Sequence, residues 1–393
     1  APEQLGELCE GRDDLDRRLA DTKVLEDGRL LLRYGYLFEW SPYFAPRALN
    51  RLLEAGVMVR AARKPSSLTT TEGVRNFERG AMFVPFDRQT VSRDTIYDLV
   101  TAAAEQDGIK VYAVESGVSA NSTEGINPGG PGFVTLRAPQ ILLLTGAGVS
   151  TYDSGEVWHL LDYRMHIPVT LRERDQLGSI DWNRYTHMVF PGGDWEAFEP
   201  EFGDRLRQWV KGGGTVVGLR QAAPWLRQQT LDWTEPDLTG TETNAAMPAQ
   251  DTAPEEAVVS ERISYADLQA TEAKNLMGGV IFRGDLDFTH PMGFGYDNRE
   301  IFLHKNVSKA LSRPENPFAV VIEYPAEPLF AGYSSAENIE ALAGTPALVA
   351  ERSGGGSVVL FADNPNFRGY WYGNNKLFLN SLFFSTLFEA PDL

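Results

Sequence analysis

The sequence predicts an α/β protein built from layered units with mostly parallel sheets. Strand-like apolar runs alternate with helix-like runs along most of the chain, and several of these strands end directly in glycine-rich turns. This pattern is typical of buried parallel strands connected through helices. At 393 residues the chain is too long for one ordinary hydrophobic core, so two or more domains are expected.

The first α/β unit is predicted over residues 29–118, after a charged lead-in at 1–28. Residues 41–56 carry apolar side chains at helical spacing and end on a glycine. A second helix is predicted over 92–108, between a serine or aspartate cap and a closing glycine. Strands are predicted at 29–40, 57–65, 80–86 and 109–117.

The second unit is predicted over residues 139–393, after a linker at 119–138 that is rich in glycine, proline and asparagine. Residues 229–258 are rich in threonine, proline, alanine and acidic residues, so we expect a mobile insertion there. Helices are predicted at 151–164, 201–214 and 375–388, and strands at 140–150, 167–171, 187–193, 215–220, 318–325, 328–333 and 356–363.

Composition argues against several classes of partner and site. The 36 basic and 54 acidic side chains give a net charge of −18, which makes nucleic acid a poor partner. The single cysteine, Cys9, rules out a disulfide within the chain and a cysteine-based zinc site. No run of 18 apolar residues occurs, so no membrane span is expected. Because the chain opens with Ala-Pro-Glu, we expect a processed chain or a piece of a longer one.

The segment TGAGVSTYDSG (145–155) follows a predicted strand and opens a helix, which is where a phosphate group could bind. Gly146 and Gly148 fit a dinucleotide-binding motif, but Thr151 stands where its third glycine should be. A tight strand-to-helix turn is therefore the better interpretation.

Glu156 and His159 lie three residues apart on one predicted helix face, as a metal-binding pair would. No second pair of this kind accompanies them, so no metal site is predicted. Asp153 and Glu156 also match a capping box, which would give the glutamate a structural role.

Conventional acyl-transfer chemistry has little support. The predicted strand at 215–220 ends where a hydrolase-like sheet would carry its nucleophile, but Arg220, Gln221 and Ala222 follow. Ser150 and Ser154 lack the sequence signature of a nucleophile turn.

The stretch DNPNFRGYWYGNN (363–375) places amides, an aspartate and an arginine among aromatic residues directly after a predicted strand. It fits either a rim that binds sugar or peptide or a turn whose asparagines and aromatics close the domain; we favour the structural interpretation. The candidate ligand-binding residues of the whole chain are Glu156, His159, Arg220, Asp363, Asn364, Asn366, Arg368, Trp371 and Asn375.

Several segments resemble the C-terminal half of large bacterial zinc carboxypeptidase-like proteins of the M14 family. They are GVSTYDSGEVWHLLDYRMHIPVTL (148–171), THPMGFGY (289–296) and NFRGYWYGNNKLFLNSLFF (366–384). YLFEWSPYFAPRALNRLLEAGVMVRAARKP (36–65) resembles the segment before that half, so the match runs over most of 30–388. The resemblance implies flavodoxin-like, class I glutamine amidotransferase-like three-layer units and a periplasmic or secreted location.

The chain departs from the catalytic motifs of both families. The His-x-x-Glu zinc motif of M14 peptidases is absent from the sequence. Where an active amidotransferase carries its cysteine, this chain has Arg220 and Gln221, and where it carries His-x-Glu, this chain has Asn364-Pro365-Asn366. The resemblance therefore implies an accessory portion without catalytic residues.

Together these observations predict a non-catalytic accessory or binding module that needs no cofactor. Its expected ligand is a peptide, a glycan or a protein, and an M14 catalytic domain is one candidate partner. A homodimer is compatible with the composition. The alternative is a diverged hydrolase, of peptidase or amidase type, with a site near the C-terminal ends of the second sheet.

Overall fold

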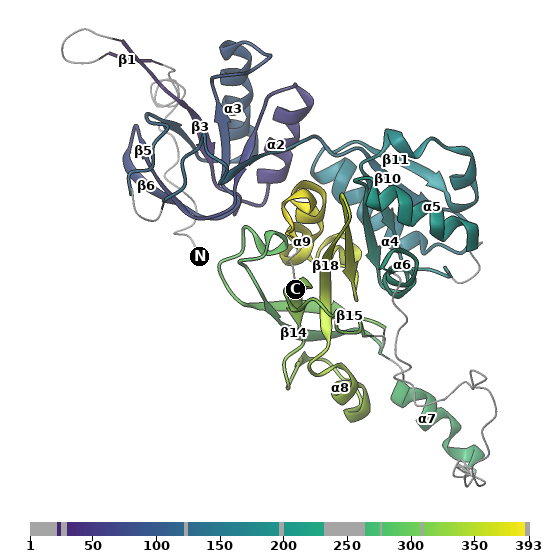
Figure 1. Ribbon diagram of the computed structural model, residues 1–393. Coiled ribbons are helices and arrows are strands. Elements are labelled where there is room, and N and C mark those ends of the chain that lie inside the picture. Colours follow the sequence, from purple (N-terminus) through teal and green to yellow (C-terminus); the bar gives the residue numbers. More distant parts are fainter. Residues whose placement is uncertain are drawn as a thin grey trace, which may run out of the picture.

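The structure is a computed structural model, and it describes residues 22–24, 30–121, 125–195, 200–231, 264–275, 277–307 and 310–389 (Figure 1). Most of the lead-in predicted at 1–28 lies outside these residues, and so does most of the insertion predicted at 229–258. Thr22–Val24 (β1) and Leu30–Leu32 (β2) form a small antiparallel ladder. Two large sheets carry the rest of the fold.

The N-terminal sheet is antiparallel throughout, so the mostly parallel sheet predicted for the first unit is wrong. Its β5–β6 hairpin shows the reason, since only Thr71 and Glu72 separate the two strands. A connection that short can join antiparallel strands only. The strand order is β6 (Gly73–Phe77), β5 (Ser66–Thr70), β8 (Val111–Val114), β3 (Gly35–Phe38), β7 (Met82–Pro85), β4 (Arg60–Ala62) and β9 (Phe133–Thr135).

Both helices predicted in this unit are present, as α2 (Ala45–Glu54) and α3 (Arg93–Asp107), and they pack on the same face of the sheet. The Oγ of Ser92 accepts a hydrogen bond from the Thr95 amide at 3.1 Å and caps α3. Gly108 ends α3 with φ of +65°, a conformation that favours glycine. β9 lies within the predicted linker and adds to this sheet beside β4.

The second sheet has a parallel half and an antiparallel half. Strands β11, β10, β12, β13 and β19 run parallel to one another. From β18 onward every pairing is antiparallel. The order is β11 (Val169–Glu173), β10 (Ile141–Thr145), β12 (His187–Phe190), β13 (Thr215–Leu219), β19 (Gly356–Phe361), β18 (Pro346–Ser353), β16 (Val320–Glu323), β14 (Val280–Leu286) and β15 (Glu300–Lys305), with β17 (Leu329–Ala331) also pairing with β14.

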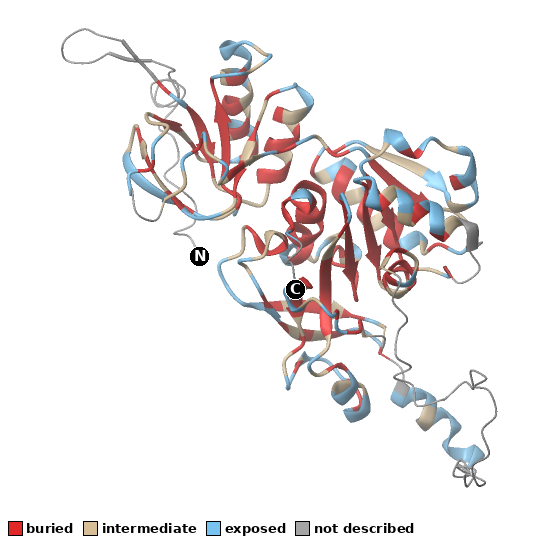
Figure 2. Cartoon of the chain, in the orientation of Figure 1, coloured by how far each residue is buried: buried red, intermediate tan, exposed pale blue. Residues whose placement is uncertain are grey.

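Helices cover both faces of the parallel half, as the α/β prediction requires (Figures 1 and 2). On one face, α4 (Thr151–Trp158), its π-helical continuation η2 (His159–Arg164) and α9 (Tyr372–Phe383) contribute to a single core. On the other face, α5 (Pro200–Lys211) and α6 (Ala222–Leu231) form a second core. α7 (Leu268–Asn275) stands away from the body, and α8 (Ala336–Leu342) lies beyond the antiparallel strands. Within the described residues, no helix combines the length and apolarity needed to cross a membrane.

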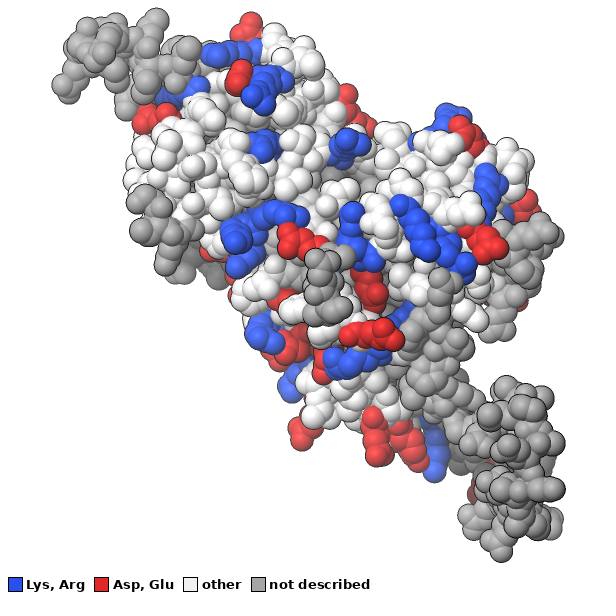
Figure 3. All heavy atoms as spheres, in the orientation of Figure 1, with Lys and Arg blue, Asp and Glu red and all other residues white. Residues whose placement is uncertain are grey.

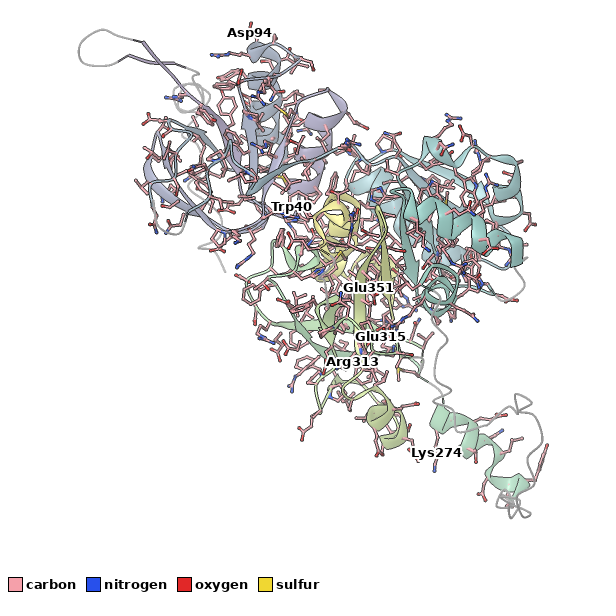
Figure 4. The ribbon with its side chains drawn as sticks, in the orientation of Figure 1. Trp40, Asp94, Lys274, Arg313, Glu315 and Glu351 are labelled. Atoms are coloured by element: carbon pink, nitrogen blue, oxygen red, sulfur yellow. The ribbon has the colours of Figure 1, made fainter. Side chains whose placement is uncertain are left out.

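Helix α9 joins the two sheets, because it is buried along nearly its whole length and its polar side chains bond to both sides (Figure 2). The indole of Trp40, from the N-terminal unit, donates to Asn380 Oδ1 at 2.7 Å. The ammonium of Lys376 donates to the carbonyls of Trp40, Ser41 and Pro42. Figure 4 shows Trp40 at this junction. A buried helix with every polar group paired fixes the two units against each other.

Candidate functional site

The C-terminal ends of the parallel strands place four loops side by side, which is where open α/β sheets bind ligands. α4 begins just after β10, Gly192 follows β12, Arg220 follows β13, and Asn364 follows β19. Hydrogen bonds connect these four positions, so the sheet topology brings together residues more than 200 positions apart in the sequence.

Asp153 is the centre of this group, and its side chain is only 3% exposed. Its carboxylate accepts hydrogen bonds from Arg220 Nη1, Asn364 Nδ2 and the Gly192 amide, each at 3.1 Å. A Cβ at position 192 would lie 2.3 Å from Asp153 Oδ2, so only glycine lets the backbone approach this closely. The carboxylate is therefore fully engaged by its own chain.

Glu156 lies one helical turn further along α4. Its Oε2 accepts from Asn364 Nδ2 at 2.5 Å, and its Oε1 accepts from the Arg368 amide at 2.6 Å. Burial raises the pKa of Glu156 from 4.5 to about 7, and the nearby charge of Asp153 adds to this rise. The predicted capping box of Asp153 and Glu156 is wrong, because Ser150 caps α4 and its Oγ accepts from the Asp153 amide.

Arg220 occupies the turn between β13 and α6 with φ of +53°, a backbone conformation that is uncommon for residues other than glycine. In hydrolases of this architecture a strained turn between strand and helix presents the nucleophile. Here the side chain of Arg220 points to Asp153 and forms an ion pair at 3.1 Å. The strained turn is thus present, but it carries a cation that is held by a buried carboxylate.

Asp363 belongs to a separate buried cluster, although it directly precedes Asn364. Its carboxylate accepts from the Lys305 ammonium at 3.0 Å and from the Tyr324 hydroxyl. The side chain of Lys305 is 0% exposed. Beside these groups lies a cavity of only ≈ 10 Å³, about the room for one water molecule. We therefore assign Asp363 a structural role.

Asn366, Trp371 and Asn375 also hold the loop. Asn366 accepts from Asn375 Nδ2 at 3.0 Å, and Tyr43 donates to Asn375 Oδ1 at 2.8 Å. The indole of Trp371 donates to the carbonyl of Phe302 at 3.1 Å. These contacts agree with the structural interpretation of the 363–375 stretch.

His159 lies at the edge of the group rather than in its centre. It stacks on Tyr163, with ring centroids 5.2 Å apart, and a Cβ at Gly369 would lie 3.1 Å from its Nδ1. Tyr163 stacks on it, Tyr370 directly follows Gly369, and Tyr372 begins α9; these three tyrosines are 72%, 54% and 45% exposed. We call these three tyrosines the aromatic rim.

The structure therefore brings together Glu156, Arg220, Asn364 and Arg368, with His159 next to them. Asn366 joins this group only through its amide, which donates to Asn364 Oδ1 at 2.9 Å, and the side chains of Asp363, Trp371 and Asn375 bond elsewhere. Sequence reasoning missed the central role of Asp153, although its spacing of three residues from Glu156 placed both on one helix face. It also missed Lys305 and Tyr324, which no local motif marks. Among the described residues, no three His, Cys, Asp or Glu side chains are grouped as metal ligands would be.

No protein-family model matches the chain, and no curated protein matches it in sequence. Among solved structures, it is similar to a ThuA-like protein from Parabacteroides merdae, at 13% identity with a TM-score of 0.36, over 65% of this chain and 94% of that one. It is also similar to a β-galactosidase from Bacillus circulans sp. alkalophilus (14% identity, TM-score 0.28) and to the exo-β-1,4-mannosidase Op5Man5 from Opitutaceae bacterium strain TAV5 (11%, 0.29). The matches cover 62% and 63% of this chain but only 30% and 36% of those enzymes.

Proposed function

We propose that this chain is a non-catalytic binding module that holds a ligand at the C-terminal edge of its parallel strands. One observation carries the proposal: the strained turn after β13 carries Arg220, which is paired with Asp153 instead of being presented to a substrate. A nucleophile at that turn would need a positioned base. The groups that surround it, Asp153 and Glu156, are instead engaged by Asn364 and by the Arg368 amide.

The exposed side of this site suits a glycan better than the other candidate ligands. Tyr163, Tyr370 and Tyr372 present aromatic faces on which the apolar face of a sugar ring can pack. His159 stacks on Tyr163 and can bond to hydroxyl groups of the sugar. A peptide or a protein partner remains the competing ligand for the same rim.

Titration of the purified chain with a panel of neutral oligosaccharides tests this proposal. We expect binding by at least one of them, weakened about tenfold or more in Tyr370→Ala and Tyr163→Ala. Tyr265→Ala is a matched control, because Tyr265 is exposed but precedes α7, away from the site. If no oligosaccharide binds, or if the rim variants bind as the wild type does, the glycan proposal fails.

The second candidate is a diverged hydrolase with Glu156 as general acid. Its pKa of about 7 favours this role, because a carboxyl group that keeps its proton near neutral pH can donate it. Release of product from oligosaccharides or peptides, lost in Glu156→Gln but kept in an Arg368 variant, would support hydrolysis over binding.

The resemblance to M14 carboxypeptidase-like proteins supports a finer version of the main proposal. In that version the parallel half is an amidotransferase-like unit without its triad. It serves as the accessory part of a periplasmic or secreted protein, beside a peptidase domain. Co-purification with an M14 catalytic domain supplied in trans would test this partnership, and failure of the two to associate would count against it.

A further inference from the structure

A cleft lies between the N-terminal unit and the loop that joins β14 to β15. Two cavities of ≈ 790 Å³ and ≈ 800 Å³ share Arg63, Lys64 and Thr289 among their lining residues. A third, of ≈ 290 Å³, shares Glu78 and Arg79 with the second. The shared residues make these spaces one continuous cleft, and each large cavity has the size of a small-molecule site.

Basic side chains gather along one wall of this cleft, which is unusual in a chain with a net charge of −18. Arg63 and Lys64 come from the turn between β4 and β5, and Arg79 comes from the turn between β6 and β7. Figure 3 shows basic side chains gathered where the N-terminal unit meets the rest of the chain. Three cations from two turns of the N-terminal unit thus line the same cleft.

The cations of this wall differ in how far their own chain satisfies them. Arg63 pairs with Glu389 at 2.6 Å and donates to the carbonyl of Leu387. Lys64 and half-buried Arg79 form no ion pair and no side-chain hydrogen bond within the described part of the chain. Lys64 and Arg79 are therefore cations of the cleft that a ligand could pair with.

Acidic residues also line the cleft, but none of them forms an ion pair with Lys64 or Arg79 within the described residues. They are Glu39, Glu78, Asp287, Asp297 and Glu389, the last of which pairs with Arg63. Asp287 Oδ1 accepts from the amide and the hydroxyl of Thr289, at 2.9 and 2.6 Å. Burial raises the pKa of Glu39 to about 7, with Glu78 nearby, so this carboxyl group is only partly ionised near pH 7. Exposed Glu78 directly precedes Arg79 in the sequence and lines the cleft beside it.

The opposite wall is largely apolar. Phe294 and Phe318 line the first cavity together with Pro291 and Leu387. Phe318 is 65% exposed although it borders a cavity, so a ligand there would cover apolar surface that now faces water. The cleft therefore combines unpaired cations with an aromatic surface.

We propose that this cleft binds a small organic anion, a carboxylate or phosphate group joined to an apolar or aromatic group. The anion would lie between Lys64 and Arg79, and the apolar group would pack on Phe318, which is 65% exposed. This second site is independent of the aromatic rim, because it lies between the two units and shares no residue with that rim.

Calorimetric titration with three matched probes tests the proposal: N-acetylphenylalanine, its neutral amide, and phenyl phosphate. We expect at least one anion to bind, and the amide to bind at least tenfold more weakly than N-acetylphenylalanine if the carboxylate is the preferred group. Stronger binding of phenyl phosphate would identify phosphate as that group. Added salt should weaken binding of the anions.

The double variant Lys64→Ala/Arg79→Ala should weaken anion binding at least tenfold and leave the unfolding curve unchanged. Lys274→Ala is the control, because Lys274 lies on α7, well away from the cleft (Figure 4). Failure of both anions to bind the wild type would overturn the proposal. The proposal would also fail if N-acetylphenylalanine and its amide bound equally well and phenyl phosphate did not bind. It would fail as well if the double variant bound the anions as tightly as the wild type does.

Discussion

The two polar regions of this molecule differ in whether the chain satisfies its own charges. At the C-terminal edge of the parallel strands, Asp153 holds Arg220 and shares Asn364 with Glu156. In the cleft between the units, Lys64 and Arg79 have no such partner within the described residues. A charge that is satisfied internally stabilises a loop, whereas an unsatisfied one is available to a ligand. On this basis we propose a structural role for the centre of the first region, and ligand binding at its rim and in the cleft.

The largest expected effect comes from Asp363→Asn, which removes the carboxylate that pairs with the fully buried Lys305 ammonium. We expect the free energy of unfolding to fall by about 3 kcal/mol or more, measured by urea denaturation. Adding Lys305→Met should restore much of the loss, since the buried charge is then gone. If Asp363→Asn changes stability by less than about 0.5 kcal/mol, this cluster is not structural.

The second-largest effect on stability is expected for Asp153→Ala, because this variant lacks the acceptor shared by Arg220, Asn364 and the Gly192 amide. We expect a loss of about 2 kcal/mol, smaller than for Asp363 because Arg220 is 17% exposed and water can reach it. Arg220→Ala and the double variant complete a thermodynamic cycle. A coupling energy near zero would show that the ion pair does not stabilise this edge.

The free energy of unfolding of wild type and of Glu156→Gln, measured at several pH values, tests whether burial raises the pKa of Glu156. Because the folded-state pKa of Glu156 is raised to about 7, the folded protein keeps a proton that the unfolded chain loses near 4.5. The wild type therefore loses this contribution as pH rises from about 4.5 through 7, and the variant does not. The free energy of unfolding of the wild type, relative to that of the variant, should therefore fall over that pH window. A difference that stays constant with pH would contradict the raised pKa.

The smallest effect on stability is expected in the cleft. Lys64→Ala and Arg79→Ala remove charges without an internal partner, so unfolding free energies should stay within about 0.5 kcal/mol of wild type. Urea denaturation of each variant provides the measurement. A loss of 2 kcal/mol or more would mean that these cations stabilise the fold, and the contrast between the two regions would disappear.

Much of the parallel half could be predicted because its signals are local. Buried runs such as 140–150 and 215–220 are apolar on both faces and end in turns, which identified β10 and β13. Strands β1, β5, β6, β9, β14, β15 and β18 were missed. β6 is largely exposed and carries charged residues, so it lacks the apolar run that the prediction relied on. The antiparallel character of the first sheet went unnoticed together with its hairpin.

The site could be predicted only in part, because sequence shows which residues follow strands but not which way they point. Asn364 and Asp363 are neighbours, yet one faces Glu156 and the other faces Lys305. The cleft left no sequence signal at all, because Lys64 and Arg79 come from separate turns of the N-terminal unit, and Lys64 and Phe318 line one cavity only through packing of the two units. Such sites depend on tertiary contacts between segments that carry no motif of their own.

The measurement that tests the central claim most directly is product analysis by mass spectrometry, on an oligosaccharide that the chain retains, after prolonged incubation. Binding without catalysis predicts that the ligand is recovered unchanged, in the wild type and in Glu156→Gln alike. Cleavage products that form with the wild type and vanish with Glu156→Gln would contradict the claim. They would make Glu156 a catalytic acid instead of a satisfied carboxyl group.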